Sequence, residues 1–137
     1  MKISIDKQEN YTIFTLLEPK LNSLIAPEMK TRLALMNSEG ERYIIFDMSH
    51  IQFVDSAGLS AILVGHRLCN NADGLFILAA PNESVQRLMA ISQLTDLLNI
   101  ADTLEKAQEM VGIEALIDAI EGDEDSDASE TSDDEDE

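Results

Sequence analysis

Cysteine is nearly absent from this chain of 137 residues, and so are long hydrophobic runs. The single cysteine, Cys69, cannot form a disulfide bond within the chain, and the lack of a cysteine framework suits a reducing compartment. No uncharged apolar run approaches the roughly 18 residues that a transmembrane helix needs, and the first residues show neither the apolar segment nor the cleavage site of a signal peptide. We therefore expect a soluble, cytoplasmic protein.

Basic residues are scarce as well. Lys and Arg number 9 against 27 Asp and Glu, which gives a formal net charge of -18. A surface this negative repels phosphate backbones and anionic lipids, so we expect no direct binding to nucleic acid and none to membranes. Eleven of the acidic residues and no basic one fall in residues 121–137, which leaves a net charge of -7 for residues 1–120.

The remaining composition divides the chain into a folded part and a tail. Apolar residues make up 45% of the chain, enough to build a core, and this excludes a wholly disordered acidic protein. Residues 121–137 hold no large apolar side chain, so burial cannot offset the entropy lost on ordering them. We predict one domain over residues 1–120, which needs no disulfide or metal to fold, and a disordered acidic tail over residues 121–137.

Hydrophobic patterns predict the strands of this domain. Ile3, Ile5, Ile13 and Leu17 lie among polar neighbours on either side of a turn at residues 7–10, which indicates an opening β-hairpin. Short apolar runs indicate three further strands, at residues 43–46, 75–78 and 97–100.

Helical spacing and capping residues predict four helices between and after these strands. They run from Pro27 to the turn at Gly40, from Asp55 to the turn at residues 70–74, onward from a cap at Asn82, and from about Thr103 to Ile120. The last helix carries an inner stripe of Leu104, Ala107 and Val111 and an adjoining apolar face of Met110, Ile113 and Ile117. The order β-β-α-β-α-β-α-β-α predicts an α/β fold, a mixed sheet of four or five strands with about four helices packed against it.

The segment from Phe53 to Ser60 carries the clearest candidate site. Asp55 can cap the helix that follows, and Ser56 then lies in its first turn, near free backbone N–H groups and the positive end of the helix dipole. A phosphate group on Ser56 would be held by the same donors. We expect Gly58 to keep the approach to Ser56 uncrowded. On the residues alone, however, a serine at a helix start is most often only part of a cap.

The same segment resembles the signature of the STAS domain, and specifically that of bacterial anti-sigma factor antagonists. The family pattern is a strand ending in Asp, a loop ending in apolar-Asp-Ser-(Ser or Ala)-Gly-Leu, and a helix. The strings YIIFDMS and DSAGLSAIL match it at Asp47, Asp55, Ser56, Gly58 and Leu59. The resemblance extends from about residue 3 to residue 116 and includes the segments LNSLIAPEM and NIADTLEKA.

The resemblance implies partner switching rather than catalysis, with no cofactor. An unphosphorylated antagonist of this family binds an anti-sigma factor that is also a serine kinase, and this frees the sigma factor. The kinase ends the interaction by phosphorylating the motif serine, Ser56 here, and a metal-dependent phosphatase of the PP2C type resets it. The implied partner-binding residues are Asn22, Ser23, Asp55, Ser56, Ala57, Gly58 and Leu59.

One loop departs from the family pattern. The loop of residues 18–23 precedes the first helix, where the family often has Gly and, after the Leu, Asp. This chain has Pro19 and Asn22 in those places. An asparagine donates and accepts hydrogen bonds but carries no charge, so a contact between this loop and the kinase would not involve a carboxylate at Asn22.

Other functions find less support in the residues. A hydrolase with Ser56 as nucleophile and His50 or His66 as base would need Gly where Val54 stands and a histidine late in the chain. His66 would also lie about 15 Å along the helix from Ser56. The two histidines, the cysteine and the scattered carboxylates show no metal-ligand spacing.

A second candidate function is compatible with the same fold. STAS domains also serve as docking modules of lipid-transport ABC systems and of anion transporters. Such a module would not need a phosphorylatable Ser56, so the complete DSAGL motif favours the antagonist.

Overall fold

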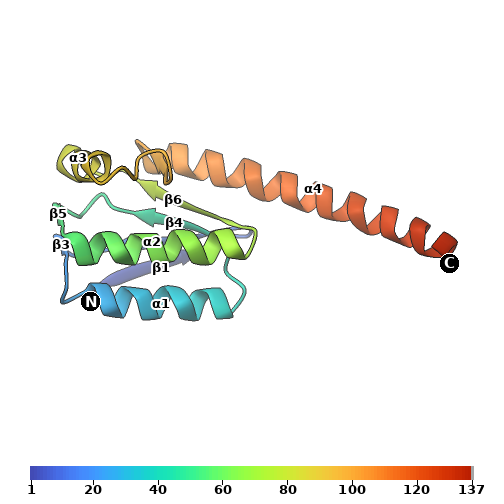
Figure 1. Cartoon of the computed structure of the whole chain (residues 1–137), viewed down its shortest axis with the longest axis horizontal. Coiled ribbons are helices and arrows are strands. Elements are labelled where there is room, and N and C mark those ends of the chain that lie inside the picture. Colours follow the sequence, from blue (N-terminus) through green and yellow to red (C-terminus); the bar gives the residue numbers. More distant parts are fainter. Residues whose placement is uncertain (137) are drawn as a thin grey trace.

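A five-stranded mixed β-sheet forms the centre of the fold (Figure 1), seen in a computed structural model that describes the backbone of residues 1–136 and the side chains of residues 1–121. Its strands, in order across the sheet, are β1 (Ile3–Lys7), β2 (Thr12–Leu16), β4 (Tyr43–Asp47), β6 (Leu75–Ala79) and β7 (Asn99–Ala101). β1 runs antiparallel to β2, and the other neighbours are parallel. The helices of the described residues are α1 (Ala26–Ser38), α2 (Ser56–Asn71), α3 (Glu83–Ile91) and α4 (Leu104–Asp136). The predicted mixed α/β fold is confirmed.

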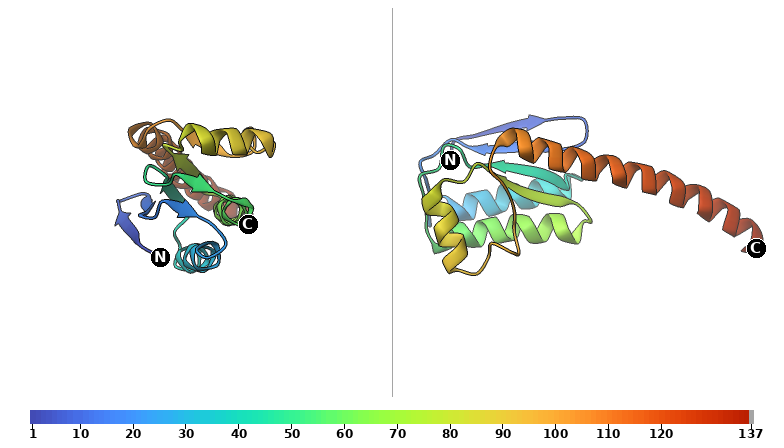
Figure 2. Two further views of the ribbon diagram at one scale, coloured as in Figure 1. Left: turned by 90° about the vertical axis from the view of Figure 1, so that its left-hand side faces the viewer. Right: turned by 90° about the horizontal axis from the view of Figure 1, so that it is seen from above.

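The two faces of the sheet are covered by different helices, as the right-hand view of Figure 2 shows. α1 and α2 pack on one face, where their buried residues form the larger core together with Phe14 and Phe46. α4 covers the other face, where Ala107 and Val111 form a second core with Ile45. Successive strand residues point to opposite faces, so a strand covered on both sides must be apolar throughout. This explains the continuous apolar run of β4.

Local chemistry at the helix ends sets several of the helix boundaries as predicted. Pro27 lies in the first turn of α1, and Gly40 follows the helix with a φ of 96°, a left-handed conformation that favours glycine. Asn82 caps α3 by accepting a hydrogen bond from the N–H of Val85 at 2.8 Å. Among the helices described here, none combines the length and the apolar character needed to cross a membrane.

α4 is longer than the periodicity predicts. It begins at Leu104 and continues to Asp136, past the predicted end near Ile120 and past the end of the sheet (Figure 1). Gly122 is the only strong helix-weakening residue in the added segment, and no proline interrupts it. The disorder of residues 121–137 stays a prediction, because the side chains of residues 122–137 lie outside the described part of the structure.

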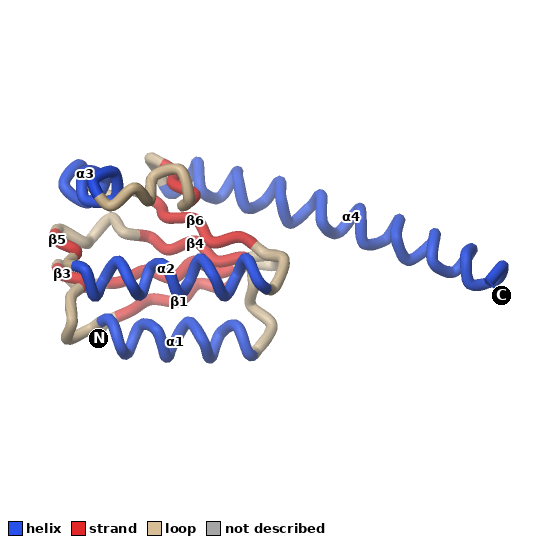
Figure 3. The backbone as a smooth tube through the Cα atoms, in the orientation of Figure 1, coloured by secondary structure: helices blue, strands red, loops and turns tan. Residues whose placement is uncertain are grey.

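The structure also contains a second, smaller sheet, which the hydrophobic patterns of the sequence do not predict. β3 (Lys20–Leu21) and β5 (Phe53–Val54) pair in parallel with two residues each, too few to leave a periodic signal. Leu17, predicted within the hairpin, follows β2 and is exposed, because the second strand ends one residue earlier. Figure 3 shows the β3–β5 pair at the end of the molecule where α1 and α2 begin. The pair therefore joins the two loops that carry the predicted site.

Candidate functional site

Ser56 is the first residue of α2, and its side chain is exposed. The preceding residue, Asp55, caps the helix in an extended conformation: its Oδ1 accepts a hydrogen bond from the N–H of Gly58 at 2.9 Å. The carbonyl oxygen of Asp55 accepts a second one from the N–H of Leu59, also at 2.9 Å. The cap predicted at Asp55 is thus confirmed, and it holds the helix start without using the hydroxyl group of Ser56.

Asp55 also connects the two halves of the predicted site. Its Oδ2 accepts a hydrogen bond from the backbone N–H of Ser23 at 3.3 Å, and its own N–H donates to the carbonyl oxygen of Leu21 at 3.2 Å. The β3–β5 pairing aligns Leu21 with Val54 just before these contacts. The loop of residues 22–23 and the start of α2 are therefore held together by hydrogen bonds of Asp55.

Gly58 has a packing role that differs from the predicted one. It is buried, and a Cβ added to it would lie 2.3 Å from the carbonyl oxygen of Leu21 and 2.9 Å from a side-chain carbon of Val54. The absent side chain lets β3 pass close to α2, so the prediction that Gly58 keeps the approach to Ser56 clear is wrong. Leu59 is buried too, and Ala57 is half-buried. Of the predicted partner-binding residues, Ser23 and Ser56 are the exposed ones.

Asn22 shapes the loop before α1. Its Oδ1 accepts a hydrogen bond from the N–H of Leu24 at 3.0 Å, and its carbonyl oxygen accepts two more from Ile25 and Ala26. An asparagine side chain that bonds two residues ahead stabilises a tight turn. The described hydrogen bonds of Asn22 therefore stabilise the loop itself. Its side chain is half-buried, and the neighbouring Ser23 and Leu24 are the exposed residues of this loop.

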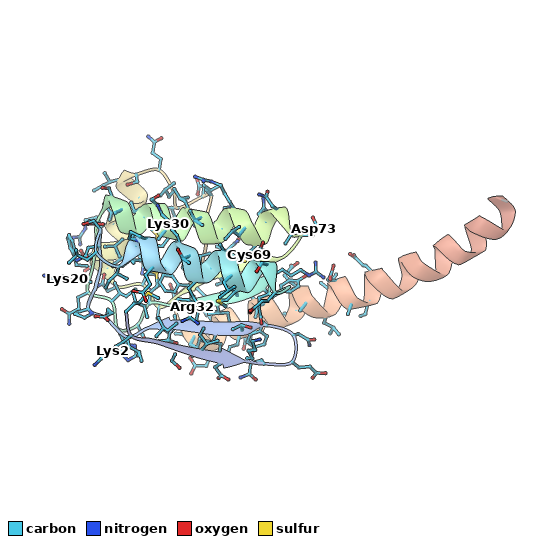
Figure 4. All side chains as sticks on the ribbon, turned by 90° about the horizontal axis from the view of Figure 1, so that it is seen from below. Lys2, Lys20, Lys30, Arg32, Cys69 and Asp73 are labelled. Atoms are coloured by element: carbon cyan, nitrogen blue, oxygen red, sulfur yellow. The ribbon has the colours of Figure 1, made fainter. Side chains whose placement is uncertain are left out.

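Two exposed apolar side chains belong to the segments around Ser56, and no pattern in the sequence indicates them. Leu24 is 86% exposed, in the turn that Asn22 shapes, and Phe53 is 50% exposed, in β5. In the β3–β5 pair, Leu21 and Val54 point into the core, and so the alternation of a strand turns their neighbours Lys20 and Phe53 outward. Figure 4 shows Lys20 at the end of the molecule where α1 and α2 begin. The outward position of Phe53 follows from the pairing, which the sequence does not reveal.

The remaining chemistry-bearing residues do not converge on Ser56. His50 is exposed and its Nδ1 lies 3.3 Å from the hydroxyl group of Ser49, while His66 is half-buried further along α2. Cys69 is buried, and burial raises the pKa of its thiol to about 12. Within the described residues, no group of three or more His, Cys, Asp or Glu side chains could hold a metal ion.

A hollow of about 500 Å³ lies away from this site. It is formed by the β1–β2 turn, the start of β4 and the α4 residues Ala115, Asp118 and Ala119. Ser56, by contrast, is exposed at the first position of α2, three residues after the exposed Phe53. The arrangement around Ser56 suits a protein partner better than a small molecule, which would need an enclosing pocket.

Comparison with known proteins points the same way. The sequence profile of the STAS domain family matches residues 2–107. The chain is 26% identical over 107 residues to the "Putative anti-sigma factor antagonist BtrV" of Bordetella bronchiseptica, covering 78% of this chain and 91% of that protein. The crystal structure of "a putative anti-sigma factor antagonist (tm1081)" from Thermotoga maritima superposes with a TM-score of 0.72 at 25% identity, over 80% of this chain and 93% of that one. The anti-sigma factor antagonist SpoIIAA in its unphosphorylated form, at 18% identity, shares the fold with a TM-score of 0.62 over 88% of this chain and 99% of that one.

Proposed function

Because the chain belongs to the STAS domain family, we propose that it acts as an anti-sigma factor antagonist whose binding is reversed by phosphorylation of Ser56. Its partner is an anti-sigma factor that is also a serine kinase, and a PP2C-type phosphatase restores the binding form. The observation that carries the proposal is the exposed Ser56 at the start of α2, held beside the loop of Ser23 by Asp55. The chain itself performs no catalysis in this proposal.

The exposed apolar residues supply contact area for the unphosphorylated form. Protein interfaces gain most of their affinity from a few large side chains that become buried at their centre. Leu24 and Phe53 offer such side chains next to Ser56, and both would lose contact with water when a partner covers this end of the molecule. Ser56 then lies inside the contact, where a small hydroxyl group fits and a larger charged group does not.

Phosphorylation changes this surface without opening the fold. A phosphate group adds roughly 1.5 to 2 negative charges at neutral pH. It would lie beside the carboxylate of Asp55, which already occupies the N–H of Gly58. The helix start attracts the added charge, so the fold is retained. A partner that packs against Ser56 meets both like-charge repulsion and the cost of desolvating the phosphate.

The test combines phosphorylation with binding. The protein is incubated with the anti-sigma serine kinase of its source organism and ATP, and intact-mass analysis follows the addition of one phosphate group. We expect this addition in the native protein and its absence in Ser56→Ala. The phosphatase should remove it. Phosphate incorporated at another residue in Ser56→Ala would contradict the assignment of Ser56.

Calorimetry with the purified kinase measures the effect on affinity. Ser56→Ala should bind like the native protein, whereas phosphorylation or Ser56→Asp should weaken binding by about a hundredfold or more. Ser84→Asp is a matched control, because Ser84 is also exposed in the first turn of a capped helix, α3. Equal affinities for the native, phosphorylated and Ser56→Asp proteins would refute the switch and favour a docking module without phosphoregulation.

A further inference from the structure

α4 presents apolar side chains on two opposite sides. Ala107 and Val111 are buried against the sheet, and Ala115 is buried one turn further along the helix. Further large apolar side chains of the same helix are exposed: Met110, Ile113, Leu116, Ile117 and Ile120. We call these five residues the outer stripe. An amphipathic helix on the surface of a domain normally turns one apolar side to the core and a polar side to water, so a second apolar side indicates a missing partner.

The spacing of the outer stripe is that of a helix-pairing surface. Each residue turns the helix by about 100°, so Ile113 lies some 200° from Val111, nearly opposite the core. The steps from Met110 to Ile113, Ile117 and Ile120 alternate between three and four residues, as in the contact seam of two paired helices. Ile113 and Leu116 are each 58% exposed. The stripe is therefore a separate face of α4 rather than the edge of the core. The sequence pattern predicts only an apolar face that adjoins the inner stripe.

A hollow beside the stripe extends it toward the sheet. It has a volume of about 310 Å³ and is lined by Leu75, Asn99, Met110, Ile113 and Glu114. A hollow of this size accepts an apolar side chain from a neighbouring segment. Two of its lining residues, Met110 and Ile113, belong to the outer stripe, so a helix laid along the stripe can anchor one side chain between α4 and the first residues of β6 and β7.

The acidic residues around the outer stripe indicate which kind of helix can bind there. At 100° per residue, Glu105 falls on one side of the stripe and Glu114 and Glu121 on the other, while Glu109 lies between the directions of Leu116 and Ile120. Lys106, the only basic residue of α4, lies in line with the stripe about one turn before Met110. Eleven acidic residues follow directly in the sequence, in residues 121–137. A second copy of this chain in parallel pairing would place two such acidic segments together, and an anionic membrane would be repelled as well.

We propose that the outer stripe of α4 binds a basic amphipathic helix of a partner protein. Leucine-like side chains of that helix cover the stripe and fill the hollow at Ile113, and its Lys or Arg residues face the acidic flanks. The surface is separate from Ser56, because α2 and α4 cover opposite faces of the sheet (Figure 2). Binding at the stripe is thus independent of phosphorylation at Ser56, and the inference does not rest on the proposed function.

The test uses a synthetic helical peptide with leucines at positions i, i+3, i+4 and i+7 and lysines elsewhere, titrated into the full chain. We expect binding that the double variant Ile113→Ser/Ile117→Ser weakens at least tenfold. Ile91→Ser is the matched control, because Ile91 is an exposed isoleucine at the end of α3. A peptide with glutamates in place of lysines, and one with serines in place of leucines, should both bind at least tenfold more weakly than the original.

Charge variants keep the test independent of the apolar substitutions. Glu105→Lys and Glu114→Lys change flanking charges, leave the five apolar residues of the stripe unchanged and should each weaken peptide binding and flatten its salt dependence. NMR shifts on adding the peptide should map to residues 105–120 and to Leu75 and Asn99 at the hollow. Equal peptide affinity of the native protein and the double variant would overturn the proposal. So would a native dimer, found by light scattering, that the double variant abolishes, or binding to anionic vesicles through the stripe.

Discussion

The carbonyl oxygen of Leu21 lies 2.3 Å from the place where a Cβ of Gly58 would stand, closer than any Cβ normally approaches another atom. β3 thus passes directly over the first turn of α2, and the missing side chain of Gly58 is what permits the approach. The two halves of the candidate site depend on this contact, because Asp55 can reach Ser23 only while the strand and the helix lie so close.

Gly58→Ala should therefore destabilise the domain, by about 1–3 kcal/mol, because the added methyl group overpacks the contact with Leu21 and Val54. Gly112→Ala is the matched control: Gly112 is also helical, and nothing lies within 4 Å of an added Cβ there. This second change should stabilise α4 by about 0.5–1 kcal/mol, since alanine favours the helix. Urea unfolding of both variants measures the difference. Equal effects of the two substitutions would show that the strand does not pass over Gly58 as described.

Asp55→Ala should cost about 1 kcal/mol, because the helix loses its cap at the N–H of Gly58. The loop before α1 should loosen as well, since the N–H of Ser23 loses its acceptor. Amide hydrogen exchange at Ser23 and Gly58 reports both effects. Asp55→Asn keeps an acceptor oxygen and should retain most of the stability. If hydrogen exchange at Ser23 stayed as slow in Asp55→Ala as in the native protein, Asp55 would not be the link between the two loops.

A pH effect is expected from Glu41. Burial tends to raise the pKa of this carboxyl group, but hydrogen bonds from Thr12 and Lys7 outweigh it and hold the pKa below its ordinary value of 4.5. A lowered pKa in the folded state contributes stability above the ordinary value, and that stability is lost as the pH falls through the folded pKa. Glu41→Gln should therefore be less stable than the native protein at pH 7, with the gap narrowing below about pH 4.5.

Thermal unfolding at several pH values checks the role of Glu41. Glu9→Gln, in the exposed β1–β2 turn, should follow the native protein at every pH. A stability gap between Glu41→Gln and the native protein that stays constant from pH 7 to pH 3 would mean that the charge of Glu41 contributes nothing.

Cys69 should not react in the folded protein. Its thiol is buried, and burial raises its pKa to about 12, so the reactive thiolate is almost absent at neutral pH. A thiol reagent at pH 7.5 should modify the native protein only as fast as the domain opens, and should modify one thiol per chain in denaturant. Fast modification without denaturant would place Cys69 at the surface.

Deletion of residues 121–137 should leave the melting temperature nearly unchanged, because the segment has no large apolar side chain to bury. The same deletion removes eleven acidic residues and should alter the salt dependence of partner association. Narrow, uniform amide signals from these residues in NMR spectra of the full chain would agree with the predicted disorder. A clear loss of melting temperature on truncation would show that the segment docks on the domain.

The sequence by itself determined the features that depend on neighbours along the chain. The caps at Asp55 and Asn82 were predictable because each bonds to an N–H only three residues ahead. The buried strand β4 was predictable because a strand covered on both faces must be apolar throughout. The position of Ser56 in the first turn of α2 follows from its cap alone, and so the sequence sufficed to indicate it.

The tertiary structure decided what depends on segments far apart in the chain. Ser23 and Asp55 are separated by 32 residues, and the β3–β5 pair that joins them is too short to leave a pattern. The roles of Gly58 in packing and of Phe53 as an exposed neighbour of Ser56 both follow from that pair. For α4, the periodicity correctly indicated the inner stripe that the sheet covers, but it gave Met110, Ile113 and Ile117 only as an adjoining face and did not show that they stay exposed. Periodicity records the spacing of apolar residues along one element, whereas burial depends on which other element lies against it.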